Sequence, residues 1–372
     1  MSTTTADRTR GPVITAWSAV SPFGVGREAF EQGLLSGQGT AQRPDTTRWG
    51  VVADTHVHVV PGFEVREVLG KAGTRGLDRA TGLTITAVRD LLGRAPDLAA
   101  DQGLTTALVL GTTTHSAKGY ADVTRASFEG RRPQDVPTVA LPSMAMNRAT
   151  SAGAIWHGFR GPNSTIAAGR ASGLMSLGYG RRLLAARRAD HVVVGGTEEY
   201  SQARSWIEYH RRPVNSDHGG LGEGSAVLLL ERPESVPGGR TVLAEVLSVT
   251  SRVDVEGDPV TALHACLSAS LTDAGVSPPD VWAAMSTGCG GTAESEENRL
   301  LIDIFGGQAL SRPDIATLIG DTSAAASVFQ IAALLSTAGS TAADRDRVAL
   351  VTATDPDGGV ASAVLRLPRS AR

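Results

Sequence analysis

Residues 161–199, GPNSTIAAGRASGLMSLGYGRRLLAARRADHVVVGGTEE, form the stretch that decides the expected fold. The apolar run at 164–168 is typical of a buried strand, and the small residues that follow it allow the backbone to turn sharply. Leucines at roughly helical spacing then predict a helix, and 191–194 predicts a second strand that ends at a glycine pair. This order of strand, tight turn, helix and strand is typical of an α/β protein.

Arg170 lies at the tip of that tight turn, and we call residues 166–173 the elbow. A side chain at such a tip sits at a strand end and a helix N-terminus. Enzymes of the α/β class hold a nucleophile there, because the helix end stabilises negative charge. Arginine stays protonated in proteins and cannot be a nucleophile. The stretch therefore predicts the architecture of a catalytic site without its chemistry.

Outward from the elbow, strand-like and helix-like segments alternate in both directions. Apolar runs predict strands at 11–25 (with its turn), 105–110, 225–230, 241–253, 282–287, 316–319, 348–353 and 362–367. Helical spacing predicts helices at 66–92, 116–130, 139–157, 260–274 and 324–338, and turn residues predict a loop at 210–224. The alternation predicts a layered α/β fold with buried, largely parallel sheets.

The chain divides into two halves of similar pattern, because strands that end in small residues lead into helices in both. We predict a flexible N-terminus at 1–10, an N-terminal half at 11–235 and a C-terminal half at 236–372, packed as one compact unit. The join lies near 232–240, RPESVPGGR. The similarity is one of pattern and not of identity.

Composition excludes several classes of protein. The 372 residues carry a net charge of −3, which gives no reason to expect nucleic acid or an acidic membrane surface as a partner. We expect no membrane helix, because no run approaches the ~20 apolar residues that one needs, and we expect no secretory signal in the polar N-terminus. Two cysteines, Cys266 and Cys289, do not make a disulfide scaffold. We therefore expect a cytoplasmic protein.

Seven segments in a fixed order carry a family resemblance. They are VITAWSAVSPFGVG, GLDRATGLTITAV, LVLGTTT, GPNSTIAAGRASGL, ADHVVVGGTEE, GGLGEGSAVLLLE and GGVASAVLRL. In this order they resemble the β-ketoacyl synthases of the thiolase superfamily over nearly the whole chain. The resemblance implies a thiolase-like fold, in which two pseudo-repeated halves form α-β-α-β-α layers.

Active members of that family need a cysteine at the elbow and two histidines from the second half. The thiol attacks an acyl thioester, an oxyanion hole that includes the elbow amide holds the tetrahedral intermediate, and the histidines assist decarboxylation. By the resemblance, the cysteine position falls on Arg170 and the histidine positions fall on Ser286 and Asp321. We therefore predict no catalytic residue and regard these three positions as vestigial.

Other family positions are also replaced. The family's lysine falls on Ala316, and its aromatic gate falls within 355–357, whereas Glu297 keeps an acidic position. Loss of every catalytic group on a retained scaffold narrows the resemblance to the ketosynthase β subunits, or chain-length factors, of type II polyketide synthases. Aromatic-polyketide members commonly carry Gln at the elbow, so Arg170 departs from their pattern.

The resemblance also implies partners. Such a chain forms a heterodimer with an active ketosynthase α subunit, shapes the acyl tunnel and limits chain length. The acyl chain arrives on a phosphopantetheinylated acyl carrier protein, so the chain itself needs no metal and no bound cofactor. Residues from the dimer seam intrude on the tunnel in relatives, which makes Thr114, Ser116 and Tyr120 candidates for setting its length. Plain interface packing is the alternative role for these three.

Two further questions stay open at the level of sequence. Arg170 and Asp321 occupy positions that converge in active relatives, so we hypothesise that they form a buried ion pair, because a buried arginine needs a partner. The alternative is an outward-pointing Arg170. The chain is either the non-catalytic subunit, an independent acyltransferase or condensing enzyme that uses Ser172, Ser286 or Cys289, or a homodimeric scaffold protein.

Overall fold

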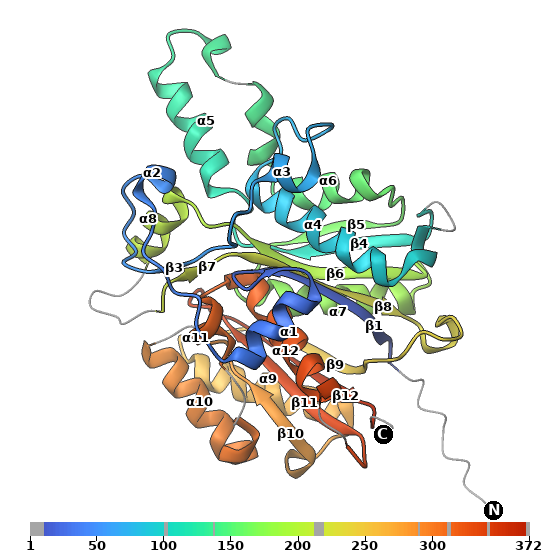
Figure 1. Ribbon diagram of the computed structural model, residues 1–372. Coiled ribbons are helices and arrows are strands. Elements are labelled where there is room, and N and C mark those ends of the chain that lie inside the picture. Colours follow the sequence, from blue (N-terminus) through green and yellow to red (C-terminus); the bar gives the residue numbers. More distant parts are fainter. Residues whose placement is uncertain are drawn as a thin grey trace, which may run out of the picture.

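The computed structural model describes residues 11–99, 103–136, 138–211, 219–288, 291–310, 314–340 and 343–369 (Figure 1). The predicted flexible N-terminus at 1–10 and the candidate nucleophile Cys289 lie outside these ranges. The strands are β1 (Val13–Ser21), β2 (Gly24–Val25), β3 (Val57–His58), β4 (Thr106–Gly111), β5 (Asn163–Ile166), β6 (His191–Glu198), β7 (Leu221–Gly222), β8 (Gly224–Glu231), β9 (Ala244–Val253), β10 (Val281–Met285), β11 (Arg347–Thr354) and β12 (Gly359–Leu367).

The helices cover most of the segments between the strands. They are α1 (Arg27–Ser36), α2 (Thr46–Trp49), α3 (Val65–Leu69), α4 (Arg79–Arg94), α5 (Ala117–Glu129), α6 (Arg148–His157), α7 (Ser172–Ala185), α8 (Gln202–Arg211), α9 (Pro259–Ala274), α10 (Gly291–Phe305), α11 (Ile315–Ile319) and α12 (Ala326–Ser340). Short 3-10 turns include η3 (Thr138–Met144) and η7 (Ser323–Ala325).

Ten strands form one mixed sheet in the order β10-β11-β12-β9-β1-β8-β6-β4-β5, with β2 paired to β1, while β3 and β7 pair separately. Only a short antiparallel pairing joins β1 to β9, Val13 to Glu245 and Ile14 to Ala244, so the sheet has two distinct parts. Among the described residues of this sheet, the parallel pairs are β4–β5, β4–β6 and β10–β11, and the separate pair β3–β7 is also parallel. The prediction of largely parallel sheets is wrong. The turn 355–358 makes β11 and β12 antiparallel, and the pairs β1–β8, β6–β8 and β9–β12 are antiparallel between strands that are not joined by a tight turn.

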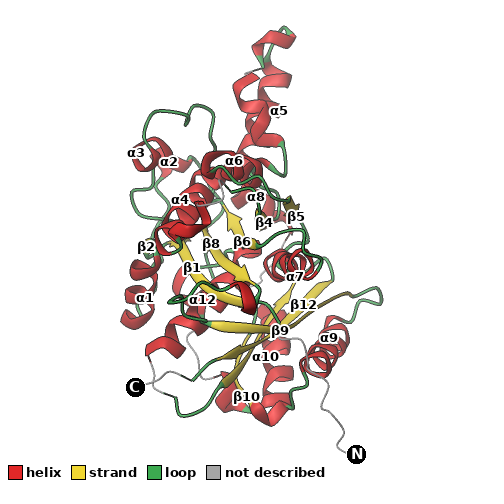
Figure 2. Ribbon diagram, turned by 90° about the vertical axis from the view of Figure 1, so that its right-hand side faces the viewer, coloured by secondary structure: helices red, strands yellow, loops and turns green. Residues whose placement is uncertain are grey.

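Helices α7 and α12 lie between the two parts of the sheet, since α7 packs on β4, β6 and β9, and α12 packs on β8 and β11 (Figure 2). Helices α4 and α6 cover one outer face, and α9 and α10 cover the other. The expectation that no run approaches a membrane helix is wrong by length and composition, because Ser323–Ser340 are long and apolar enough to span a membrane. However, 67% of this segment is buried inside the protein. It is therefore accounted for as the core helix of the layered fold.

Two glycines let β6 continue beyond the predicted end of the strand at 194. A Cβ on Gly195 would lie 2.3 Å from the main-chain oxygen of Ala226, and one on Gly196 would lie 2.5 Å from that of Ala324. The strand therefore runs to Glu198, because only glycine allows β8 and η7 to approach so closely. This close approach carries the chain to the two acidic residues, Glu198 and Glu199, at the strand end.

Four local predictions are wrong. Residues 316–319 form helix α11 and not a strand, because the Asp314 side chain accepts a hydrogen bond from Ala316 N and Gly320 ends the helix with φ 74°. The predicted helix at 66–92 is divided into α3 and α4 by a glycine-containing segment. Pro142 restricts the start of the predicted helix at 139–157 to the 3-10 turn η3, and part of the predicted loop at 210–224 belongs to α8 and β7.

Candidate functional site

The elbow joins the end of β5 to the start of α7. Gly169 has the left-handed φ of 57°, which permits the sharp turn. The Ser172 hydroxyl accepts a hydrogen bond from Ala168 N (2.8 Å) and lies 2.6 Å from the Gly169 carbonyl oxygen, to which it donates. Ser172 is fully buried. The elbow is therefore fixed by its own main chain and serine, and Arg170 is held at its tip.

The Arg170 side chain points inward and forms an ion pair with Asp321. Nη2 of Arg170 lies 2.6 Å from Oδ2 of Asp321, and the two side chains are only 11% and 8% exposed. The predicted ion pair is confirmed, and the alternative of an outward-pointing arginine is wrong. Two positions 151 residues apart in the chain thus meet as opposite charges in the interior.

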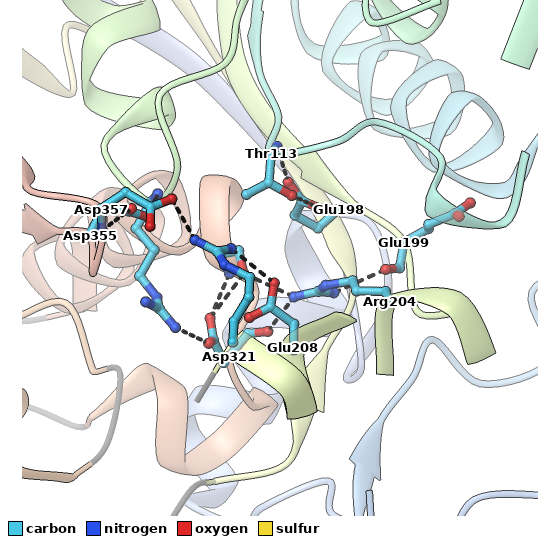
Figure 3. A network of polar contacts seen from close by, with 11 residues as sticks. Thr113, Glu198, Glu199, Arg204, Glu208, Asp321, Asp355 and Asp357 are labelled. Atoms are coloured by element: carbon cyan, nitrogen blue, oxygen red, sulfur yellow. Dashed lines mark hydrogen bonds and ion pairs between the residues drawn. The ribbon is translucent and has the colours of Figure 1, made fainter. Parts of the chain in front are cut away.

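Asp321 is held on several sides. Its Oδ1 accepts hydrogen bonds from the Ser323 amide (2.8 Å) and hydroxyl (3.3 Å), and Arg204 of α8 donates to its main-chain oxygen at 3.0 Å (Figure 3). Burial raises the pKa of Asp321, but the charge and hydrogen bond of Arg170, with the charge of Arg204, outweigh burial and hold that pKa well below its usual range. Asp321 is therefore an ionised carboxylate at neutral pH.

The elbow amide has a second acidic partner that the sequence did not predict. Arg170 N–H donates to Oδ2 of Asp355 at 2.8 Å, and Asp355 is 8% exposed. The resemblance had assigned the aromatic gate to 355–357 without predicting this contact. No local signal could have found it, because 185 residues separate the two partners.

Ser286 directly follows β10 and is half-buried. Its main-chain oxygen accepts a hydrogen bond from the Gln330 side chain of α12. Nearby Glu297 is buried, and it accepts hydrogen bonds from hydroxyl groups on Thr287 (3.0 Å) and Thr354 (3.3 Å). Burial raises the pKa of Glu297 against these hydrogen bonds. Glu297 of α10 therefore links β11 to the segment that follows β10.

A small cavity lies beside Asp321. It has a volume of about 10 Å³, roughly the space that one water molecule needs. Its lining includes Asp321, Thr287, Ala316 and Gln330. An acyl chain does not fit in this cavity.

The three candidate tunnel residues lie on the loop before α5 and in its first turn. Thr114 is exposed and Tyr120 is 41% exposed, whereas Ser116 is buried. The Ser116 hydroxyl donates to Oε1 of Glu199 at 3.0 Å and accepts from Gly119 N at 3.0 Å. Ser116 is therefore the N-cap of α5, while Thr114 and Tyr120 face outward.

Two buried glutamates at the end of β6 hold that loop, and the sequence analysis missed their role. Glu198 accepts hydrogen bonds from the Thr113 amide and hydroxyl, and Glu199 accepts from Ser116 and from the Lys118 amide (3.2 Å). Burial raises the pKa of each carboxyl to about 7, against these hydrogen bonds. The only sequence signal is two adjacent acidic residues at the end of an apolar strand.

Comparisons with known proteins agree with this architecture. The family model described as "Beta-ketoacyl synthase, N-terminal domain" matches residues 12–235. A solved structure described as "The ishigamide ketosynthase/chain length factor" is 41% identical with a TM-score of 0.90, covering 96% of this chain and 99% of that chain. Among curated proteins, the "Actinorhodin polyketide putative beta-ketoacyl synthase 2" of Streptomyces coelicolor is 27% identical, covering 79% of this chain and 77% of its own length. The "3-oxoacyl-[acyl-carrier-protein] synthase 2" of Rhizobium meliloti is 23% identical, covering 87% and 86%.

The fold is therefore a mixed α/β fold that matches solved ketosynthase structures, as the sequence predicted. The family model matches more than half of this chain, and the chain therefore belongs to the β-ketoacyl synthase family. The predicted pseudo-repeat of the two halves and the boundary near 235 stay predictions.

Proposed function

We propose that this chain is the non-catalytic, chain-length-factor subunit of a polyketide ketosynthase complex and pairs with an active ketosynthase. The observation that carries the proposal is the buried Arg170–Asp321 ion pair at the tip of the elbow. By the family resemblance, these two residues stand where an active synthase has its cysteine and one of its histidines. The similarity to a ketosynthase/chain length factor at 41% identity supports the same assignment.

The chemistry of the elbow agrees with a non-catalytic role. A guanidinium that stays protonated cannot attack a thioester. Asp321, with its lowered pKa, is a carboxylate and has no proton to donate at neutral pH. The cavity beside the pair has room for about one water molecule. The tip of this elbow therefore offers an acyl group no nucleophile, and the cavity beside Asp321 is too small to hold one.

The partner surface is proposed at the β5 edge of the sheet. Strand β5 is the terminal strand in the sheet order, and its residues are exposed or half-buried. Helix α5 projects beyond the sheet layers in both views and carries the exposed side chains Tyr120 (41%) and Phe128 (85%) (Figures 1 and 2). Because an unprotected edge strand and exposed aromatic side chains favour association, this side suits a second ketosynthase-type chain.

The proposed role in setting chain length rests on α5. Tyr120 lies in its first turn, and the Glu199 carboxylate holds the Ser116 cap and the Lys118 amide of that turn. A side chain on such a fixed turn can block a tunnel at a defined depth. In the proposed complex, an acyl carrier protein delivers the growing acyl chain to the ketosynthase. Tyr120 of this subunit reaches the tunnel across the interface and limits the length of the acyl chain.

The independent acyltransferase has less support. Its candidate Ser172 is fully buried and bonded to the elbow main chain, which leaves its hydroxyl unsuited to attack. Ser286 is half-buried, and by the resemblance no histidine stands at either family position to activate its hydroxyl. No specific observation favours the homodimeric scaffold.

Active-site labelling tests the proposed function. The chain is co-purified with a candidate ketosynthase and treated with an acyl-thioester analogue, and the intact mass of each chain is measured. We expect one adduct on the ketosynthase and none on this chain. A stoichiometric adduct on this chain would overturn the non-catalytic assignment and favour the acyltransferase.

A further inference from the structure

The elbow amide, the group that would have to hold the oxygen of a bound acyl group, already has a ligand within the chain. Arg170 N–H donates to Oδ2 of Asp355 at 2.8 Å. The contact lies just before the first residue of α7, where the helix end favours negative charge. A carboxylate that accepts a main-chain N–H at such a position makes a charge-assisted hydrogen bond.

The Asp355 side chain is held firmly in this position. Its Oδ1 accepts from Asp357 N at 2.9 Å, its amide donates to Gly359 O at 2.8 Å, and its carbonyl accepts from Gly358 N at 2.9 Å. These bonds belong to the tight turn 355–358 that joins β11 to β12. Oδ2 of Asp355 therefore binds the elbow amide, and Oδ1 accepts a hydrogen bond within the turn itself.

The elbow is shaped around this carboxylate. A Cβ on Gly169 would lie 1.9 Å from Oδ2 and 2.2 Å from Cγ of Asp355. Two features therefore disfavour a side chain at Gly169: its left-handed φ of 57° and the Asp355 carboxylate packed against it. Asp355 is 8% exposed, so the contact is not an incidental surface bond.

We propose that Asp355 is a built-in anionic ligand that occupies the anion-binding position of the elbow. The space next to the Arg170 amide accommodates a small carboxylate, and here the carboxylate comes from the β11–β12 turn of the same chain. A thioester oxygen could reach the elbow amide only by displacing this carboxylate. The inference concerns the chain's own elbow and holds with or without a ketosynthase partner.

Chemical rescue tests the proposal. The Asp355→Ala variant is melted in sodium formate and in sodium chloride of equal concentration, in whichever soluble form the chain is purified, alone or in its complex. We expect a lowered midpoint that formate, and not chloride, raises by roughly 1–2 °C at about 0.5 M, because a ligand that binds the folded state stabilises it. Asp357→Ala is the matched control, since Asp357 shares the turn and pairs with Arg211 at 2.6 Å on the surface. It should show no formate-specific shift.

A second readout covers an Asp355→Ala variant that fails to fold. Asp355→Asn keeps the side-chain shape and an oxygen acceptor but removes the charge. We expect amide exchange in peptides that cover 168–174 to rise several-fold in Asp355→Asn and to stay at the wild-type rate in Asp357→Ala. Wild-type exchange at the elbow in Asp355→Asn, or equal effects of formate and chloride on Asp355→Ala, would overturn the proposal. Neither result would bear on partner binding, which a separate measurement tests.

Discussion

The ion pair between Arg170 and Asp321 can be dissected with a double-mutant cycle. The two side chains are about nine-tenths buried, and their charged atoms lie 2.6 Å apart. Removal of either partner therefore leaves an unpaired charge in the interior. Asp321→Asn deprives the guanidinium of its carboxylate, and we expect a loss of about 3–5 kcal/mol in the free energy of unfolding. Arg170→Met should cost less, about 2–3 kcal/mol, because the Ser323 amide and hydroxyl still bind the Asp321 carboxylate.

The measurement is equilibrium urea unfolding of the wild type, both single variants and the double variant. Because both single changes remove the same interaction, the double variant should recover about 2–3 kcal/mol relative to the sum of the singles. The exposed pair Lys118–Asp122 on α5 is the matched control, and its cycle should give a coupling below about 0.5 kcal/mol. A coupling below 0.5 kcal/mol for Arg170 and Asp321 would refute the argument that the two charges stabilise each other in the interior.

Three further predictions concern the glutamates, the elbow glycine and the tunnel. Glu198 and Glu199 have pKa values raised to about 7, so the folded state keeps protons that the unfolded state releases near pH 4.3. Stability should therefore fall by up to about 1.4 kcal/mol per pH unit for each group as pH rises from about 4.3 to 7. In urea titrations, the free energy of unfolding of a Glu198→Gln/Glu199→Gln variant should depend less on pH than that of the wild type. An unchanged pH dependence would contradict the raised pKa values of the two glutamates. Gly169→Ala should lower the free energy of unfolding by about 2–5 kcal/mol, because the left-handed φ and the contact with Asp355 both oppose a Cβ; a loss below 1 kcal/mol would show that the turn adapts. In the reconstituted complex, Tyr120→Ala should lengthen the products seen by mass spectrometry and Phe128→Ala should not, whereas unchanged lengths in both would leave Tyr120 as interface packing alone.

The elbow could be predicted because its signals are local. A strand, a run of small residues and a helical leucine pattern fix the backbone near Arg170 within about twenty residues. The meeting of Arg170 with Asp321 followed from the family order of segments together with the high cost of an unpaired buried arginine. The local strand, turn and helix signals, and the cost of an unpaired buried charge, do not depend on where a segment lies in the fold.

The missed features depend on contacts between distant parts of the chain. Asp355 reaches the elbow amide from 185 residues away, and nothing near Asp355 marks it as a ligand. Short apolar runs such as 316–319 also fit either a strand or a helix, and the Asp314 cap decided that case. The predicted direction of the strands was wrong for a similar reason, since antiparallel pairs such as β1–β8 and β9–β12 join strands that lie far apart in the chain.

Complex formation tests the central claim most directly. The chain is co-expressed with a candidate ketosynthase that has the elbow cysteine and both histidines, and the mass of the complex is measured by size-exclusion chromatography with light scattering. The proposed function predicts a one-to-one complex and a chain that is insoluble or unstable alone. A stable homodimer that does not bind the ketosynthase would contradict it.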